Sequence, residues 1–244
     1  MSAIANALFL IRKVVENQAN GLTFTALNKD SGIPQGSAHR IVKELVELRI
    51  LDYDPERKTY RGGLILASLG AQVLGHYSLR KSARPSLEAL HTELGHVVTL
   101  GIREGTNGIY IDKLEATDMG LRLHSEIGKA FPLHCTAMGK VLLAHAEESD
   151  RQQVFKKKLT ALTPNTITNT EQLKTALSNV LEKGYAIDDE EITRGLICVA
   201  APVFSLEGAD IGALSFTCQK HTFDEIGSDR IVEAVINAAQ QASA

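Results

Sequence analysis

The chain has 244 residues, of which 44% are hydrophobic, and 26 Lys and Arg stand against 29 Asp and Glu for a formal net charge of −3. This length is comfortable for two domains, and the apolar share is enough for a packed core. The three cysteines are too widely spaced for a disulfide framework, no apolar run could cross a membrane and no signal peptide is recognised, so we expect a cytoplasmic protein.

The two ends of the chain differ in charge. Residues 1–62 carry nine Lys and Arg against seven Asp and Glu, whereas residues 63–244 carry seventeen against twenty-two. A mildly basic small domain joined to a larger acidic one fits a protein that binds nucleic acid through its N-terminal part.

Three helices are predicted first. The first ends near Asn20-Gly21, and its apolar residues at helical spacing are Ile4, Leu8, Ile11 and Val15. Thr23 can cap a second helix over about 24–30. The third begins after Pro34 and is amphipathic. Its apolar face consists of Ala38, Ile41, Val42, Leu45 and Leu48.

Two short strands follow, at Ile50–Tyr53 and Thr59–Arg61, with a charged turn between them. Helix, helix, turn, helix and hairpin is the order of a winged helix-turn-helix, whose third helix enters the major groove of double-stranded DNA. Arginine there can read guanine, and cations on the hairpin can reach phosphate. The candidate DNA-binding residues are Gln35, Ser37, His39, Arg40, Lys43, Arg57 and Lys58.

A helical linker and a second domain are predicted next, which gives the layout 1–63, 64–94 and 95–244. The linker comprises helices at 64–77 and from Ser78 to about Leu94, with a kink expected at Pro85. Strands are then predicted at 97–103, 109–113, 122–124, 185–188, 197–204 and 210–217, and helices at 136–145, 149–159, 171–183 and over the last twenty residues. Such an order predicts an α+β domain with an antiparallel sheet.

Four segments resemble the IclR family of bacterial transcription regulators. They are residues 21–63, 78–95, 127–144 (IGKAFPLHCTAMGKVLLA) and 184–204 (GYAIDDEEITRGLICVAAPVF). The resemblance implies a regulator of sugar-acid catabolism, with a GAF-like effector-binding domain, no enzyme activity and no cofactor. The family often has Lys-Ser after the turn proline, where this chain has Gln35-Gly36.

The helix predicted from Thr136 begins a candidate ligand site. Thr136 can cap it and leave the amides of Ala137, Met138 and Gly139 free, which favours a small carboxylate. The resemblance implies effector binding by these loop amides, and also by Asp188, Cys198, Ser215 and Thr217. Strand alternation places Ser215 and Thr217 on one face. Leu123, Leu133 and Leu196 are expected to shape the pocket.

The other charged residues near this site are not assigned to ligand binding. The acid run Asp189, Glu190 and Glu191 is taken as a solvated surface, and Lys140 as the partner of an ion pair rather than of a ligand. An acid such as Asp188 accepts hydrogen bonds, so we expect the effector to carry a hydroxyl as well as its carboxylate.

Other classes of protein fit parts of the pattern. Cys198, His134 and Asp188 could form a hydrolase triad, but their spacing shows no nucleophile turn. His134, Cys135 and Cys198 have the ligand types of a zinc site without a compact motif. A winged helix can also serve protein interaction alone, and Asp188 or Cys198 can be ordinary turn and core residues.

Self-association is expected because one winged helix reads only a few base pairs, so useful affinity requires two on a two-fold operator. The first helix and the linker at 64–94 are the candidate dimer seam. The resemblance implies dimers or tetramers and favours repression of a catabolic operon, with activation as the alternative. The sequence names neither the effector nor the operator.

Overall fold

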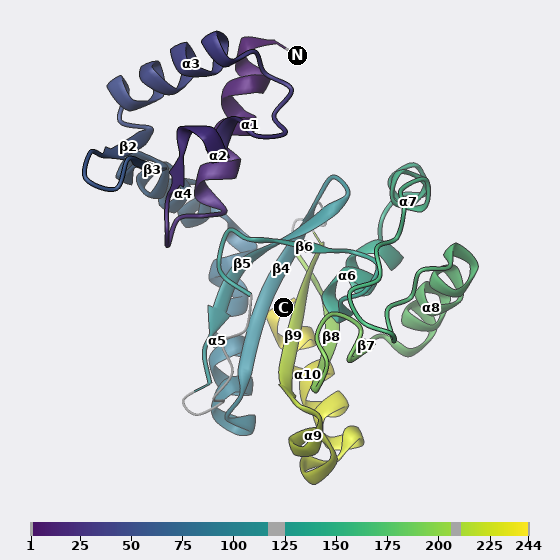
Figure 1. Ribbon diagram of the computed structural model, residues 1–244. Coiled ribbons are helices and arrows are strands. Elements are labelled where there is room, and N and C mark those ends of the chain that lie inside the picture. The colour runs from purple at the N-terminus through teal and green to yellow at the C-terminus, as the bar shows by residue number, and fades with distance from the viewer. Residues whose placement is uncertain (1, 117–124, 206–210, 244) are drawn as a thin grey trace. The chain divides into compact units, whose positions relative to one another are not determined.

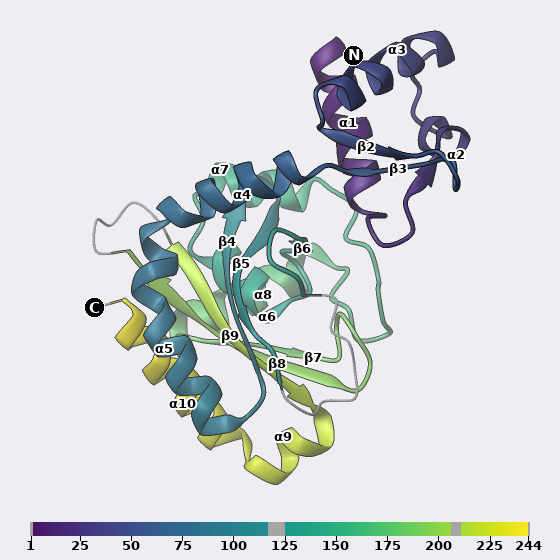
Figure 2. The same ribbon diagram turned by 90° about the vertical axis from the view of Figure 1, so that its left-hand side faces the viewer.

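The computed structural model describes residues 2–116, 125–205 and 211–243, which divide into two units, Met1–His76 and Tyr77–Ala244 (Figures 1 and 2). The predicted strand at Arg122–His124 and turn at Glu207-Gly208 lie outside the described residues.

The N-terminal unit has the predicted order of helices and strands. Its elements are α1 (Ala3–Val15), β1 (Leu22–Thr23), α2 (Phe24–Asn28), α3 (Gln35–Glu47), β2 (Leu51–Asp54), β3 (Thr59–Gly62) and α4 (Leu64–His76). The strands form an antiparallel sheet in the order β1-β3-β2, of which β1 was not predicted. Thr23 caps α2 by accepting from the amide of Ala26 at 3.3 Å. The winged helix-turn-helix prediction is confirmed.

Three of the four apolar residues whose spacing predicted α1 are exposed, and the fourth, Ile11, is half-buried against the core. Ile4, Leu8 and Val15 are 82%, 48% and 46% exposed, while Leu10 and Val14 enter the core of the unit. The helix has more than one apolar stripe, and a helical period alone does not say which stripe faces the core. On α3 the predicted apolar face is buried except for Leu48, which is exposed at the helix end.

Helix α4 carries apolar side chains that its own unit leaves uncovered. None of its residues is buried within the described part of the chain. The exposed ones are Leu64 at 85%, Ile65 at 41%, Leu69 at 54% and Val73 at 60%. A helix this apolar is seldom left facing water, so its surface is a candidate interface.

The C-terminal unit is an antiparallel sheet with helices on its faces (Figure 2). Its helices are α5 (Ser78–Leu94), α6 (Ala137–Ala144), α7 (Glu148–Phe155), α8 (Thr170–Lys183), α9 (Lys220–Ile226) and α10 (Ser228–Ala242). Its strands are β4 (Val97–Glu104), β5 (Asn107–Leu114), β6 (Ala130–Pro132), β7 (Ala186–Asp189), β8 (Leu196–Phe204) and β9 (Ile211–Gln219), in the order β6-β5-β4-β9-β8-β7. The α+β class is confirmed; β6 and α9 were not predicted, and the helix expected at 149–159 ends at Phe155.

The two faces of the sheet have different coverings. Helices α5 and α10 pack together on one face, and α6 packs on the other, where its side chains form a core with α8. That second core includes Ala200 of β8 and Ala213 of β9, which fixes the direction of neighbouring side chains by alternation.

A β-bulge interrupts the pairing of β4 with β5. Gly101 pairs with Tyr110 but Leu100 pairs with Asp112, so Ile111 is the extra residue. Tyr110 packs against the core on the α6 side, whereas Asp112 meets two arginines of α5 on the opposite side. The bulge therefore lets two residues of one strand, only two positions apart, face opposite sides of the sheet.

Candidate functional site

The polar face of α3 is open to solvent. Gln35, His39, Arg40 and Lys43 are exposed and Ser37 is half-buried. Lys43 pairs with Glu47 at 3.8 Å, a surface contact that contributes little to stability. Within the described residues no acceptor holds the Arg40 side chain, which leaves its guanidinium free for a partner.

His39 is held by a contact that the sequence did not reveal. Its ring stacks on Phe24 at the start of α2, with centroids 3.8 Å apart and planes 25° apart. The stacking joins the two helices of the helix-turn-helix, so His39 has a packing role beside any contact with DNA.

The hairpin tip that carries Arg57 and Lys58 has a fixed backbone. The Asp54 carboxylate accepts from the amides of Glu56 and Arg57, each at 3.0 Å, and these bonds lower its pKa. Lys58 then takes the left-handed conformation, with φ at 53°. Both cationic side chains are exposed at this turn.

The start of α6 has the predicted cap. Thr136 accepts from the amide of Gly139 at 3.0 Å and donates to the carbonyl of Pro132 at 2.8 Å. The expectation of three free amides is therefore wrong for Gly139, because its cap occupies it. The amides of Ala137 and Met138 meet no acceptor among the described residues.

The four predicted pocket residues on strands lie together on the sheet. Asp188 of β7 pairs with Cys198 of β8, which pairs with Thr217 of β9. The Thr217 hydroxyl donates to the Cys198 sulfur at 3.2 Å. Ser215, two positions before Thr217 on the same face, shares a hydrogen bond of 2.7 Å with Thr99. Thr99 in turn donates to the Met138 sulfur at 3.6 Å, which joins this row to the start of α6.

Asp188 is a buried acid with one carboxylate oxygen that accepts no hydrogen bond. It is 1% exposed, and its Oδ1 accepts from the amides of Glu191 at 2.7 Å and Ile192 at 3.4 Å. Its buried Oδ2 has no partner among the described residues. Burial raises the pKa of this carboxyl to about 7. A buried oxygen without a partner is costly, and a bound ligand would satisfy it.

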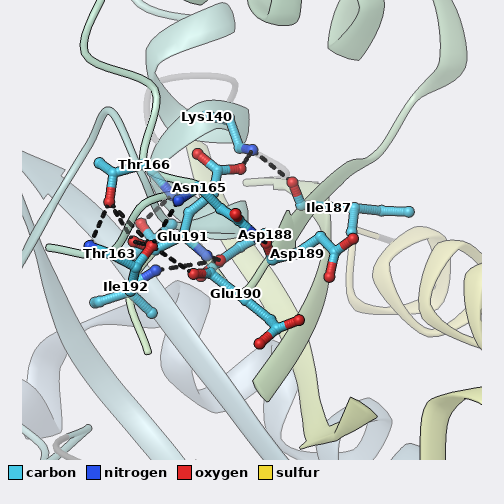
Figure 3. A network of polar contacts seen from close by, with 12 residues as sticks. Lys140, Thr163, Asn165, Thr166, Ile187, Asp188, Asp189, Glu190, Glu191 and Ile192 are labelled. Atoms are coloured by element: carbon cyan, nitrogen blue, oxygen red, sulfur yellow. Dashed lines mark hydrogen bonds and ion pairs between the residues drawn. The ribbon is translucent and has the colours of Figure 1, made fainter. Parts of the chain in front are cut away.

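The acid run after Asp188 is only partly solvated. Glu191 is 7% exposed and forms an ion pair with Lys140, which also donates to the carbonyl of Ile187 (Figure 3). The interpretation of Glu191 as a surface residue is therefore wrong, because one turn of α6 brings a buried lysine to it; the ion pair expected for Lys140 is present. Thr163 and Thr166 hold the same loop by donating to the Glu191 carbonyl.

Two residues of this neighbourhood were missed in the sequence. Thr99 and Tyr110 stand on β4 and β5, which the resembling segments do not cover. Burial raises the pKa of Tyr110, and nearby Cys198, Asp188 and Cys135 raise it further. The strand order, in which β4 pairs with β5 and β9, brings them into the same sheet as β7 and β8. Alternation within one strand carries no such signal.

Two hollows lie elsewhere in the unit. One of about 370 Å³ is lined by α5 and α10, and one of about 200 Å³ opens beside Lys140, α8 and β7. Neither is lined by Asp188, Cys198, Ser215 or Thr217. The chemistry of unpaired groups, rather than empty volume, therefore identifies the candidate ligand site.

The alternative chemistries gain no support. Burial raises the pKa of the Cys198 thiol well above its usual value and that of Cys135 to about 12, the opposite of what a cysteine nucleophile needs. In the described part of the chain, no group of His, Cys, Asp and Glu could hold a metal ion. Among those same residues, no helix combines the length and hydropathy of a membrane span.

Known proteins match nearly the whole chain. The family model of the IclR helix-turn-helix domain matches residues 8–55, and that of the bacterial transcriptional regulator IclR C-terminal domain matches residues 71–244. The Escherichia coli regulator XynR is 34% identical over 88% of this chain and 85% of its own, and the E. coli repressor YiaJ is 28% identical over 99% and 86%.

A solved structure shares the fold. An IclR homologue from Microbacterium hydrocarbonoxydans, complexed with 4-hydroxybenzoate, has a TM-score of 0.82 at 24% identity over 99% of this chain and 98% of that chain.

Proposed function

Because this chain belongs to the IclR family of bacterial transcription regulators, we propose that it is a cytoplasmic repressor that binds a two-fold operator and responds to a small hydroxy acid. The family makes it a ligand-responsive DNA-binding regulator rather than an enzyme. The observation that carries the choice of ligand is the unpartnered Oδ2 of Asp188 on the sheet face that α6 covers.

The two ends of such an acid would meet complementary groups. The free amides of Ala137 and Met138 at the start of α6 would hold the carboxylate, since a helix N-terminus attracts anions. The hydroxyl would donate to Asp188, with Cys198, Ser215 and Thr217 beside it. The ligand of the Microbacterium homologue, 4-hydroxybenzoate, also combines a carboxylate with a hydroxyl.

Repression and dimerisation complete the proposal. YiaJ is a repressor, and this supports the same sign of regulation here. The exposed apolar surfaces of α1 and α4 would meet the same surfaces of a second copy, which would place two α3 helices on one operator. Within this scheme residues 1–63 bind DNA, 64–94 link and 95–244 bind the effector.

The proposal is tested by two linked measurements. The purified protein is melted in the presence of pyruvate, D-glycerate, D-gluconate, 4-hydroxybenzoate and, as a control, butyrate. We expect at least one hydroxy acid and not butyrate to raise the melting temperature. The same acid should then change operator affinity in a gel-shift titration. Stabilisation by none of the acids would contradict the proposed effector class.

Replacing Arg40 with alanine should weaken operator binding by about 1–3 kcal/mol if its guanidinium reads a base. The exposed, unpaired position of Arg40 on α3 is the reason. Gel-shift titrations at one salt concentration compare it with Arg230→Ala, which removes the same charge from an exposed position of α10. Equal affinity of the Arg40 variant and wild type would remove this residue from the interface.

Replacing both Arg57 and Lys58 with alanine should weaken binding to operator and random DNA alike. Each lost phosphate contact lowers the slope of log affinity against log salt by about one, because fewer counterions are released. Titrations at several salt concentrations measure this slope, with Lys156→Ala plus Lys158→Ala as a charge-matched control. A slope equal to that of wild type would show that the hairpin does not contact DNA.

A further inference from the structure

Tyr110 occupies a fixed position on the α6 side of the sheet. Its ring lies against Phe131, with centroids 4.6 Å apart and planes 47° apart. Phe131 cannot retreat from it toward the strand, because a Cβ atom added at Gly108 would lie 2.1 Å from the Phe131 ring. The two rings therefore pack in one arrangement, and the Tyr110 hydroxyl is presented at a defined place.

Tyr110 lies at the candidate ligand site, because Tyr110 and Cys198 pack against the same core cluster, which also contains Met138 of α6. The pKa of the Tyr110 hydroxyl is raised by burial and by its proximity to Cys198, Asp188 and Cys135, so the phenol is neutral at pH 7. A neutral phenol can both donate and accept a hydrogen bond. Tyr110 is half-buried, and no side chain or carbonyl among the described residues supplies that partner, which leaves the hydroxyl available to a ligand.

The other polar side chains on this face of the sheet already form hydrogen bonds with one another. Ser215 and Thr99 share a hydrogen bond, and Thr217 donates to Cys198. The buried oxygens of this neighbourhood that are left without a partner are the Asp188 Oδ2 and, beside it, the Glu191 Oε2. The Tyr110 hydroxyl, on β5, also forms no hydrogen bond with the described residues, and β5 and β7 lie on the two sides of the β4-β9-β8 centre. A ligand that satisfies both Asp188 and Tyr110 must offer two polar groups besides its carboxylate.

We propose that Tyr110 is a further effector-contact residue, whose hydroxyl and the Asp188 carboxyl together select a polyhydroxy acid over a simple keto acid. This inference rests on the proposed function and narrows its ligand class. Selection arises because a buried hydroxyl left unpaired in the complex weakens binding of an acid that lacks the matching group.

The test compares wild type, Tyr110→Phe and Asp188→Ala by calorimetric titration with D-gluconate, D-glycerate and pyruvate. Phenylalanine keeps the ring packing on Phe131, so the melting temperature and operator affinity without acid should stay at wild-type values. Gluconate should bind wild type most tightly, and Tyr110→Phe should lose about 10- to 100-fold of that affinity while pyruvate binding changes little. Tyr185→Phe, a half-buried tyrosine of the same unit, serves as the matched control.

The outcomes distinguish failure of the role of Tyr110 from failure of the proposed effector site. If Tyr110→Phe binds gluconate as tightly as wild type while Asp188→Ala does not, the site stands and the role of Tyr110 is wrong. Preference of wild type for pyruvate over gluconate would also overturn the selection. If no acid binds wild type, the proposed effector class fails together with this inference.

Discussion

Replacing Leu69 and Val73 with glutamate is expected to convert the proposed dimer into monomers and to lower operator affinity by about 10²- to 10⁴-fold. Both side chains are more than half exposed on α4, where the unit that contains them offers no cover. In a dimer, binding of one DNA-binding domain gives the second a high effective concentration at the other half-site. A monomer lacks this gain in affinity. Burying four added carboxylates in a symmetric seam is unfavourable, so the variant should remain monomeric.

Light scattering after size exclusion measures the mass, and a gel shift measures the affinity. Ala67→Glu is the matched control, because position 67 lies on the other side of the same helix from Leu69 and is also exposed. A double variant that keeps the wild-type mass and operator affinity would place the dimer seam elsewhere. The circular dichroism spectrum of each variant should match that of wild type, so that a change in mass or affinity is not caused by unfolding.

Replacing Asp188 with alanine is expected to abolish the effector response while operator binding without effector is preserved. A hydrogen bond to a charged group contributes about 1.5–3 kcal/mol, so ligand affinity should fall by about 10- to 150-fold. Asp188→Asn keeps an oxygen for the amides of Glu191 and Ile192 and serves as the conservative variant. Operator affinity is titrated with and without the acid that stabilises wild type; a mutant that responds as fully as wild type would exclude this site.

The pH dependence of binding adds an independent readout. The pKa of Asp188 is raised by burial to about 7, so the free protein holds this proton over most of the range below neutrality. A ligand hydroxyl that donates to the carboxylate favours the ionised form and lowers that pKa in the complex. The complex then binds fewer protons, so affinity should rise as the pH goes up from 6 to 8. Asp188→Asn should lose this rise.

The sequence predicted the order of elements better than the environment of individual side chains. Gly95 ends α5 in the left-handed conformation and Thr136 caps α6, as turn and cap chemistry required. The burial of Glu191 was not foreseen, because three acids in a row look solvated until a lysine from another helix is placed beside one of them. The apolar spacing of α1 predicted the helix but not which of its residues are buried, because a helical period does not distinguish a core from an interface.

For the candidate site too, the sequence predicted some residues and missed others. Helix capping identified the amides at the start of α6, and the resemblance supplied the residues of β7, β8 and β9. Thr99 and Tyr110 depended on which strands become neighbours, and β4 pairs with β9 across more than a hundred residues of chain. A local pattern carries no information about such pairings.

The bulge at Ile111 gives β5 a mechanical property that a regular strand lacks. Asp112, directly after it, is held by Arg84 at 2.9 Å and faces Arg80 at 3.6 Å, both on α5. Bulges bend a strand and alter its local twist. The Tyr110 ring on one side of the sheet and the ionic anchor of a helix on the other are therefore separated by a single residue. If an effector contacts Tyr110 as proposed, we expect its binding to be felt at the Asp112 ion pairs with α5 through this bulge rather than through direct contact with α5.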